Sequence, residues 1–468
     1  MKENFEWNEN EEPMEVIGRF EKMLADNGHL FFDVEDLELV IDYYLDVHNV
    51  SMASRAIQLA NEQHPYSTSF RIREARCLAY DQKYYEALEM LNKIEQVEQT
   101  DEEILLTKAE IYSLMNKHDM AVEEYKKALE YSENPDELYA DIAFEYENMN
   151  DYDTAIQYLK KALSLNPDSL SLIHEIAFFF EMTAKEEEGI EFLTEFLETH
   201  PYSKEAWFNL GIFYNNIELY EKAIEAYGYA LAIDEEFSLA YFNMANSYSN
   251  LEMYKKAIEC YEETFKYESP EAITHYYIGE NYENLDEYDK ALVQYKFALE
   301  LDQDLADAYA GIGRVFVRKG ELNNAIVYFK EAIKKAPKND EFTYELGVLY
   351  LRSEQFKLAE EIYRKIVEVT PRFSAAWLNY SLSKERQDDL DGAIDIVEKA
   401  IEINKDDASL WFRLAGYLYK SGKVRQAYIF IEKALDMDFN RYKELLAYLP
   451  ELEKEPRFIG LLEIYKNT

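Results

Sequence analysis

The sequence predicts an all-α fold built from repeated antiparallel helix pairs, and three observations carry this prediction. A small residue recurs every 34 positions along most of the 468-residue chain, with no insertion or deletion between its occurrences. Apolar residues around it follow the i, i+3, i+4, i+7 spacing of one helix face. Prolines, which cannot continue a helix, follow several of the predicted second helices. Ordinary globular cores do not repeat in phase, so the pattern indicates a solenoid.

The recurring small residue is alanine at eleven of its twelve occurrences and glycine at the other. Its positions are Ala53, Ala87, Ala121, Ala155, Gly189, Ala223, Ala257, Ala291, Ala325, Ala359, Ala393 and Ala427. A side chain held to one methyl group or less at a fixed phase indicates that another helix passes close to it in every repeat. We therefore expect twelve closely packed helix pairs, A and B, over residues 34–441.

The sixth repeat, which begins at residue 204, identifies the type of repeat. Its residues Trp207, Leu210, Gly211, Tyr214, Ala223 and Tyr227 have the W-x2-L-G-x2-Y and A-x3-F spacing of a tetratricopeptide repeat. Much of this pattern returns at Trp411, Leu414, Ala415, Ala427 and Ala434. The chain thus resembles the tetratricopeptide repeat family over residues 34–441. The resemblance implies a right-handed superhelical solenoid whose concave face takes extended peptides or partner helices.

Both ends of such an array need a cap, because an uncovered end helix exposes an apolar face. Residues 13–33 are predicted to form an N-terminal capping helix with the apolar stripe Met14, Ile17, Phe20, Met23 and Leu24. Residues 442–468 are predicted to form C-terminal capping helices with Leu445, Leu446, Leu449, Phe458, Ile459, Leu461 and Leu462. Residues 1–12 are acidic and asparagine-rich, and we expect them to be disordered.

The net charge of −45 is unevenly distributed. Residues 306–441 hold 22 basic and 22 acidic residues, so nearly all of the negative charge lies before them. Such a field disfavours nucleic acids and anionic membranes, and it favours basic partners at the acidic end. A simpler interpretation is that the acidic residues keep a long array soluble and monomeric. The absence of a signal-peptide pattern and of a long apolar run, with only two distant cysteines, predicts a cytoplasmic protein.

In the resembled family, helix A positions 2, 5, 9, 12 and 13 line the concave face. Counting from residue 34 and its equivalents as position 1, position 13 holds Asn216, Asn250 and Asn284, and then Arg318, Arg352, Arg386 and Lys420. Arg314 and Arg413 add two cations at nearby helix A positions. This row of cations is suited to an acidic peptide or a C-terminal carboxylate. The alternative is that each cation stabilises the C-terminal end of its own helix.

Two further sets complete the predicted protein-binding or peptide-binding face. Position 6 holds Asn209, Asn243 and Asn379, and position 9 holds Asn246. Position 5 holds Phe208, Phe242, Tyr276, Tyr344 and Phe412. The amides are suited to holding a peptide backbone, although asparagine at position 6 is also common in the family. The aromatic residues are suited to an apolar floor for a partner, or to packing within the superhelix.

The carboxylate clamp by which some family members bind chaperone C-termini is not predicted. Only Asn379 and Arg413 match it, whereas Tyr344, Val348 and Ser409 stand where Lys, Asn and Lys are needed. A calcium loop is not expected either. The segment with Gln387, Asp389, Asp391, Gly392 and Glu398 resembles one, but it begins with glutamine and overlaps the predicted core of helix B.

No catalytic residues, metal ligands or cofactor are expected. The seven histidines lack metal-ligand spacing, and neither a phosphate-binding loop nor a nucleophile elbow occurs. We predict a monomeric, non-catalytic scaffold that binds a protein or peptide in its groove, with the caps as a route to oligomers. The alternative is a structural or regulatory subunit of a larger assembly, including one that serves a separately encoded enzyme, with its partner on the outer face or caps.

Overall fold

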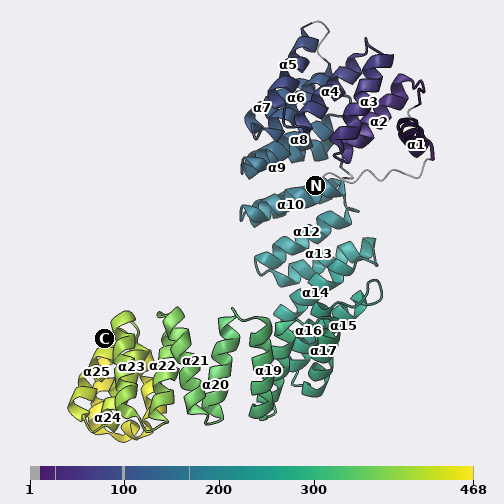
Figure 1. Ribbon diagram of the computed structural model, residues 1–468. Helices are drawn as coiled ribbons and strands as arrows, with labels where there is room; N and C mark the ends of the chain where they lie inside the picture. The colour runs from purple at the N-terminus through teal and green to yellow at the C-terminus, as the bar shows by residue number, and fades with distance from the viewer. Residues whose placement is uncertain (1–10, 27, 97–100, 168, 467–468) are drawn as a thin grey trace. The chain divides into compact units, whose positions relative to one another are not determined.

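The computed structural model describes residues 11–26, 28–96, 101–167 and 169–466. Within these ranges the chain forms α-helices, joined by turns and two short 3-10 helices, and it contains no β-strand (Figure 1). The predicted all-α architecture of repeated helix pairs is therefore confirmed. The chain divides into two compact units, Met1–Glu235 and Glu236–Thr468. The predicted disorder of residues 1–12 falls almost entirely outside the described residues.

In the first unit a single helix precedes six helix pairs. The helices are α1 Glu11–Ala25; α2 Val34–Asp46 and α3 Val50–Gln63; α4 Thr68–Tyr80 and α5 Tyr84–Glu95; α6 Glu102–Leu114 and α7 His118–Ala128; α8 Pro135–Asn148 and α9 Tyr152–Leu165; α10 Leu170–Met182 and α11 Glu186–Thr199; α12 Lys204–Asn216 and α13 Tyr220–Ile233. Even-numbered helices up to α24 are the A helices of their repeats.

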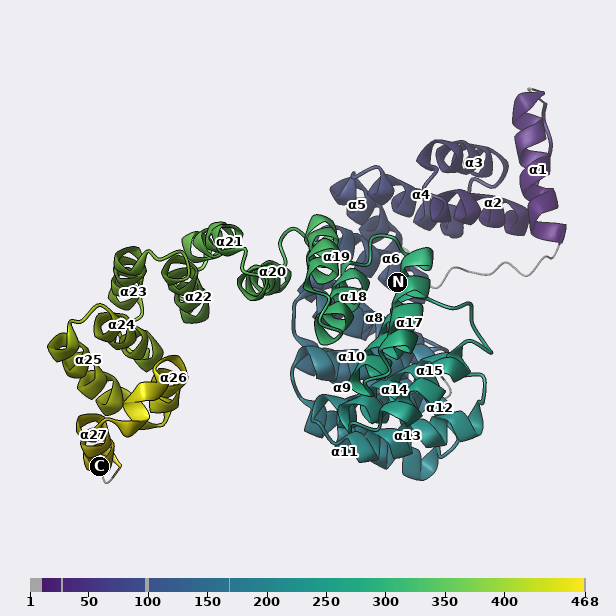
Figure 2. The same ribbon diagram turned by 90° about the horizontal axis from the view of Figure 1, so that it is seen from below.

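In the second unit six helix pairs are followed by shorter helices. They are α14 Ser238–Asn250 and α15 Tyr254–Thr264; α16 Ala272–Asn284 and α17 Tyr288–Leu301; α18 Ala306–Arg318 and α19 Leu322–Lys335; α20 Asp340–Arg352 and α21 Phe356–Val369; α22 Ser374–Glu385 and α23 Leu390–Ile403; α24 Ala408–Lys420 and α25 Val424–Met437; then η1 Phe439–Arg441, α26 Tyr442–Tyr448, η2 Pro450–Lys454 and α27 Pro456–Tyr465. Helix α26 packs beside α24, as Figure 2 shows.

The turn between the two helices of a pair has the same backbone in all twelve repeats. One residue in each turn has a positive φ, and these residues are His48, Gln82, Asn116, Asn150, Ala184, Glu218, Glu252, Asp286, Gly320, Glu354, Asp388 and Gly422. In the first turn the backbone N–H of Asn49 donates to the carbonyl of Tyr44 at 2.7 Å. The backbone N–H of His48 donates to the carbonyl of Leu45 at 3.0 Å. These two bonds are the Schellman arrangement, which satisfies the last carbonyl groups of helix A.

The predicted close approach of helices at the small position is confirmed. The eleven alanines at this position are all 0% exposed. A Cβ added at Gly189 would lie 2.6 Å from the ring of Phe213, which explains glycine in the fifth repeat. A second close approach lies within the pairs, because a Cβ at Gly279 would lie 2.8 Å from the ring of Tyr295. Aromatic side chains of helix B thus pack directly on the backbone of helix A.

The predicted proline stops are also found. Pro65, Pro167, Pro201, Pro337 and Pro371 each lie two residues after the end of a B helix. The carbonyls of the prolines that precede the sixth and eleventh repeats are also acceptors. Trp207 Nε1 donates to the carbonyl of Pro201 at 3.0 Å, and Trp377 Nε1 donates to that of Pro371 at 2.8 Å. The position 4 tryptophan of these repeats therefore binds the turn that precedes its helix.

The predicted capping stripes are only partly buried. In α1, Ile17, Phe20 and Met23 are buried, whereas Met14 is 62% exposed. After the last repeat Leu445, Leu449 and Phe458 are buried, whereas Ile459 is 42% exposed.

Candidate functional site

Side chains at positions 6, 9, 12 and 13 of consecutive A helices meet one another, and we call the surface that they form the A face. In the first unit Arg76, at position 9 of α4, lies 3.7 Å from Asp42 and 3.2 Å from Glu110, its equivalents in the neighbouring repeats. In the second unit Arg314 lies 3.4 Å from Glu283 of the preceding A helix. These bridges show that the A face continues from one repeat to the next.

The four cations of position 13 lie at the ends of their helices, on the A face of the second unit. Arg318, Arg352 and Lys420 are the last residues of α18, α20 and α24, and Arg386 is the C-cap of α22. All four side chains are exposed. This placement satisfies both interpretations of the row, because a cation there interacts favourably with the helix dipole and also remains accessible to a ligand.

The four cations differ in their partners. In the part of the chain that the structure describes, Arg318 and Arg352 have no ion-pair partner. Arg386 Nε lies 3.6 Å from Oε2 of the adjacent Glu385. Lys420 Nζ lies 2.8 Å from Glu385 Oε1 and 4.1 Å from the centre of the Tyr448 ring. The first three cations are therefore more available to a ligand than Lys420.

Tyr448 of α26 occupies the A face at the last repeat. Its hydroxyl donates to Glu385 Oε1 at 3.1 Å, and its ring lies 5.1 Å from the guanidinium of Arg413. A Cβ at Gly416, which stands at position 9 of α24, would lie 2.7 Å from this ring. The segment after the repeats thus covers the surface that Arg413 and Lys420 were predicted to offer to a partner.

Arg314 is also engaged within the chain. It lies 3.4 Å from Glu283 and 3.9 Å from Glu280. Burial alone would lower the pKa of its guanidinium, but the charge of Glu283 and the hydroxyl groups of Tyr295 and Tyr276 raise it above the usual range. Arg314 therefore stays charged and holds α16 and α18 together.

The predicted asparagine set divides into two groups. Asn216, Asn250 and Asn284 are exposed last residues of their helices. The others make hydrogen bonds within the chain: Asn209 donates to the carbonyl of Glu205 and to His174, Asn243 to the carbonyl of Leu239, Asn379 to the hydroxyls of Tyr344 and Tyr363, and Asn246 accepts from Tyr261. Their amide groups already have partners in the free protein.

The aromatic residues of position 5 pack mainly against the B helix of their own repeat. Phe208 and Phe412 are only 6% and 1% exposed. The rings of Phe242, Tyr276 and Tyr344, which are half-buried, lie 5.4, 5.8 and 5.7 Å from those of Tyr261, Tyr295 and Tyr363. This arrangement favours packing within each repeat over an apolar floor for a ligand.

The segment that resembles a calcium loop is helical where the repeat register predicts helix B. Asp389 is the N-cap of α23, and its carboxylate accepts from the amide of Gly392 at 2.9 Å. Ala393 and Val397 are both 0% exposed. Among the described residues no cluster of His, Cys, Asp or Glu has the arrangement of a metal site.

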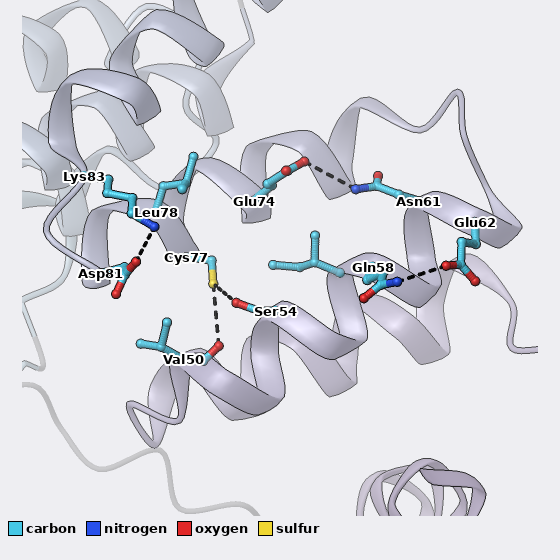
Figure 3. A pocket seen from close by; sticks show the side chains of 11 residues that line it. Val50, Ser54, Gln58, Asn61, Glu62, Glu74, Cys77, Leu78, Asp81 and Lys83 are labelled. Carbon is cyan, nitrogen blue, oxygen red and sulfur yellow. Dashed lines mark hydrogen bonds and ion pairs between the residues drawn. The ribbon is translucent and has the colours of Figure 1, made fainter. Parts of the chain in front are cut away.

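A cavity of about 430 Å³, which no sequence pattern indicated, lies between α3 and α4 (Figure 3). Cys77 lines it, and its thiol lies 3.3 Å from the hydroxyl of Ser54. Burial raises the pKa of this thiol, and the hydrogen bond to Ser54 only partly opposes the shift. The thiol is therefore protonated at neutral pH and is a poor nucleophile.

Sequence reasoning also missed a group of exposed apolar side chains on the A face of the first unit. Phe144 and Phe178, at position 9 of α8 and α10, are 46% and 49% exposed. Met182, at position 13 of α10, is 55% exposed. The same count of positions that identified the cations would have found them.

Comparison with known proteins agrees with this architecture. Profiles described as tetratricopeptide repeat match residues 102–135, 137–169, 204–237, 239–268, 316–379 and 386–449, and one described as TPR repeat matches residues 285–320. None of the curated proteins compared with the chain matches it. No helix among the described residues is long and apolar enough to cross a bilayer.

Several solved structures are similar to the chain. The C-terminal part of a TPR repeat-containing protein from Cytophaga hutchinsonii has 22% identity, covers 55% of this chain and 99% of its own, and superposes with a TM-score of 0.45. YrrB, described as a TPR protein with an unusual peptide-binding site, has 24% identity over 39% of this chain and 95% of its own, with a TM-score of 0.32. The APC/C hetero-tetramer Cut9–Hcn1 has 15% identity over 87% and 94%, with a TM-score of 0.40. The profile matches, which together cover more than half of the residues, and the helix pairs show that the chain belongs to the tetratricopeptide repeat family.

Proposed function

We propose that this protein is a non-catalytic scaffold that holds a protein or peptide segment on the A face of its second unit. In this proposal Arg318, Arg352 and Arg386 contact carboxylate groups of the partner, one in each of three consecutive repeats. The partner is a protein segment, and neither nucleic acid nor a membrane, because the net charge of −45 repels polyanions.

The exposed arginine row is the observation that carries the proposal. Residues 306–441, which contain the row, hold 22 acidic residues. Arg318 and Arg352 nevertheless pair with none of those that the structure describes. A single exposed ion pair contributes little to affinity. Three guanidinium groups at one repeat spacing act together, and each can bind a carboxylate through two parallel hydrogen bonds.

The test replaces Arg318, Arg352 and Arg386 with Ser. The matched control replaces Lys338, Arg364 and Lys365, which are exposed cations at other positions, so both variants lose three positive charges. Pull-downs from lysate at low and moderate salt identify the partner, and titration with the purified partner measures its affinity. We expect the row variant to lose the partner and the control to retain it. Equal retention by both would leave the row with a helix-end role alone.

A third variant, with Lys at the three row positions, separates recognition from the helix dipole. Lysine keeps the charge at each helix end but lacks the planar guanidinium fork. If the row binds carboxylates through paired hydrogen bonds, this variant binds the partner more weakly while its thermal stability stays unchanged. Unchanged affinity would show that the charge alone is recognised.

A second candidate function is a subunit of a larger assembly that docks through the caps, residues 13–33 and 442–468. It is favoured by exposed apolar side chains there, since Phe31 is 69% exposed and Ile464 is 63% exposed. Light scattering after gel filtration tests whether the chain forms oligomers, and whether Phe31→Ser or Ile464→Ser makes it monomeric. A wild-type monomer at all concentrations would remove self-association from this candidate.

A further inference from the structure

The exposed apolar group on the A face of the first unit follows a row of ion pairs. In the first three repeats position 9 holds Asp42, Arg76 and Glu110, and Arg76 forms an ion pair with each of the other two. In the fourth and fifth repeats the same position holds Phe144 and Phe178, each about half exposed. Position 9 faces the neighbouring A helix, so two large apolar side chains lie where the earlier repeats satisfy each other with charges.

The helices that carry these phenylalanines are acidic. Neither α8 nor α10 contains a Lys or Arg residue, and Glu147 and Glu175 lie on their A face at positions 12 and 6. Glu175 is half-buried, and no cation pairs with it in the described ranges of the chain. Burial, and next the charge of Glu147, raise the pKa of Glu175. The second repeat shows the contrast, because its position 6 residue Arg73 pairs with Asp42 and Glu103.

The two features require the same kind of partner. Apolar groups that cover half-exposed phenylalanine and methionine side chains remove apolar surface from water, and this stabilises the complex. A carboxylate that is half-buried beside a second carboxylate is stabilised in its charged form by a nearby cation. A ligand with apolar groups alone would leave the two carboxylates without a cation. A ligand with cations alone would leave the apolar side chains exposed to water.

We propose that Phe144, Phe178, Met182, Glu147 and Glu175 form a docking surface for a basic amphipathic segment of a protein partner. Bulky apolar side chains of the segment cover the two phenylalanines and Met182, and its Lys or Arg residues pair with the two carboxylates. The proposal rests on the proposed function only in using the A face. The site lies in the first unit, and its ligand has the opposite charge to the one that the arginine row would bind.

The test uses a fluorescein-labelled peptide of about 18 residues, with Leu on one helical face and Lys on the other. Two matched peptides accompany it: a scrambled sequence of the same composition, and one in which every Lys is replaced by Glu. Binding is followed by the fluorescence anisotropy of the peptide as the full chain is added. Salt at about 0.15 M screens non-specific attraction of a basic peptide to an acidic protein. We expect the amphipathic basic peptide to bind about ten-fold more tightly than the scrambled one, and the acidic peptide not to bind at this site.

Two double variants locate the binding. Phe144→Ser with Phe178→Ser removes the apolar contacts, and Glu147→Gln with Glu175→Gln removes the charges at unchanged size. Their controls are Leu165→Ser with Phe297→Ser, which are similarly exposed side chains on B helices, and Glu187→Gln with Glu191→Gln on α11. We expect each site variant to weaken binding by about ten-fold and each control to change it less than about two-fold.

Three results would overturn the proposal: no binding of the basic peptide, equal binding of the scrambled peptide, or equal effects of site and control variants. Circular dichroism checks that the serine variant keeps its helices, and the glutamine variant gives an independent measurement if it does not. The variant with serine at Arg318, Arg352 and Arg386 should bind the basic peptide like the wild type. Failure of this docking surface can therefore be told apart from failure of the arginine row.

Discussion

Two glycine-to-alanine substitutions in the sixth repeat should have different effects on stability. Gly211 lies in α12 and Gly228 lies in α13, both inside helices. A Cβ at Gly211 would lie 2.6 Å from Cδ1 and 2.9 Å from Cζ of Tyr227, whose ring is almost fully buried. A Cβ at Gly228 would meet nothing within 4 Å. The pair therefore compares a close approach with open space in one repeat.

The expected magnitudes follow from two opposing effects. Alanine is favoured over glycine inside a helix by about 1 kcal/mol at either site. At Gly211 overpacking against the Tyr227 ring costs about 1–3 kcal/mol, because a close-packed interior yields little. Ala245 stands opposite Tyr261 at the same two positions of the next repeat, so a helix pair can accept this combination, and we expect the lower end of that range. Gly228→Ala should thus raise the free energy of unfolding by about 1 kcal/mol, and Gly211→Ala should leave it unchanged or lower it by up to about 2 kcal/mol.

Hydrogen exchange measured by mass spectrometry on peptides from α12 and α13 is the appropriate assay. A solenoid does not need to unfold in one step, whereas exchange reports local opening. Exchange should be roughly five-fold to a hundred-fold faster in Gly211→Ala than in Gly228→Ala. Adding Tyr227→Leu should remove most of this difference, since Ala143 with Leu159 is a natural combination at these positions. Equal protection in both alanine variants would refute the packing of the Tyr227 ring on the α12 backbone.

Three other perturbations test separate parts of the structure. Ala291→Leu places three more carbons at a site that is 0% exposed, and it should cost about 1–3 kcal/mol in urea unfolding; an unchanged midpoint would mean that the register of this repeat is wrong. Burial, followed by the charges of Glu259 and Glu263, raises the pKa of Cys260 to about 11, so its alkylation by iodoacetamide in a Cys77→Ser chain should keep accelerating up to about that pH; a plateau near pH 9 would contradict the shift. Tyr448→Phe removes the hydrogen bond to Glu385 and should destabilise α26 by about 1 kcal/mol, seen as faster hydrogen exchange in that helix; unchanged exchange would show that the bond does not hold α26 in place.

The 34-residue period was sufficient to predict the helix pairs, because each pair repeats the same local physics. The small position, the proline stops and the helical segment after Asp389 all follow from helix geometry and close packing, which depend on residues near in sequence. Met14 and Ile459 were predicted to join the apolar stripes of the caps but are exposed. The caps are not periodic, so no second copy of the pattern indicated which side of α1 or α27 would be covered.

The partners of the A-face side chains could be predicted less well. Phe208 and Phe242 share position 5, yet the first is buried and the second is half-buried, so the repeat position alone does not determine exposure. Arg413 and Lys420 are engaged by Tyr448, which belongs to a helix outside the repeats. Phe144 and Phe178 were detectable from position 9 alone, since that position had already been assigned to the concave face of the resembled family.

The residue with a positive φ in each turn within a repeat offers a site where stability can change without any change to the surface that binds a partner. Ten of these twelve residues carry a Cβ, and for most of them the conformation costs of the order of 1 kcal/mol, which Gly320 and Gly422 avoid. Each turn lies within its own repeat, so such local contributions should add independently. A substitution to glycine at Glu218 or Glu354 could therefore compensate for a destabilising change among the side chains that meet a partner. The repeat architecture thus allows the binding surface to change in sequence while substitutions in the turns maintain the stability of the fold.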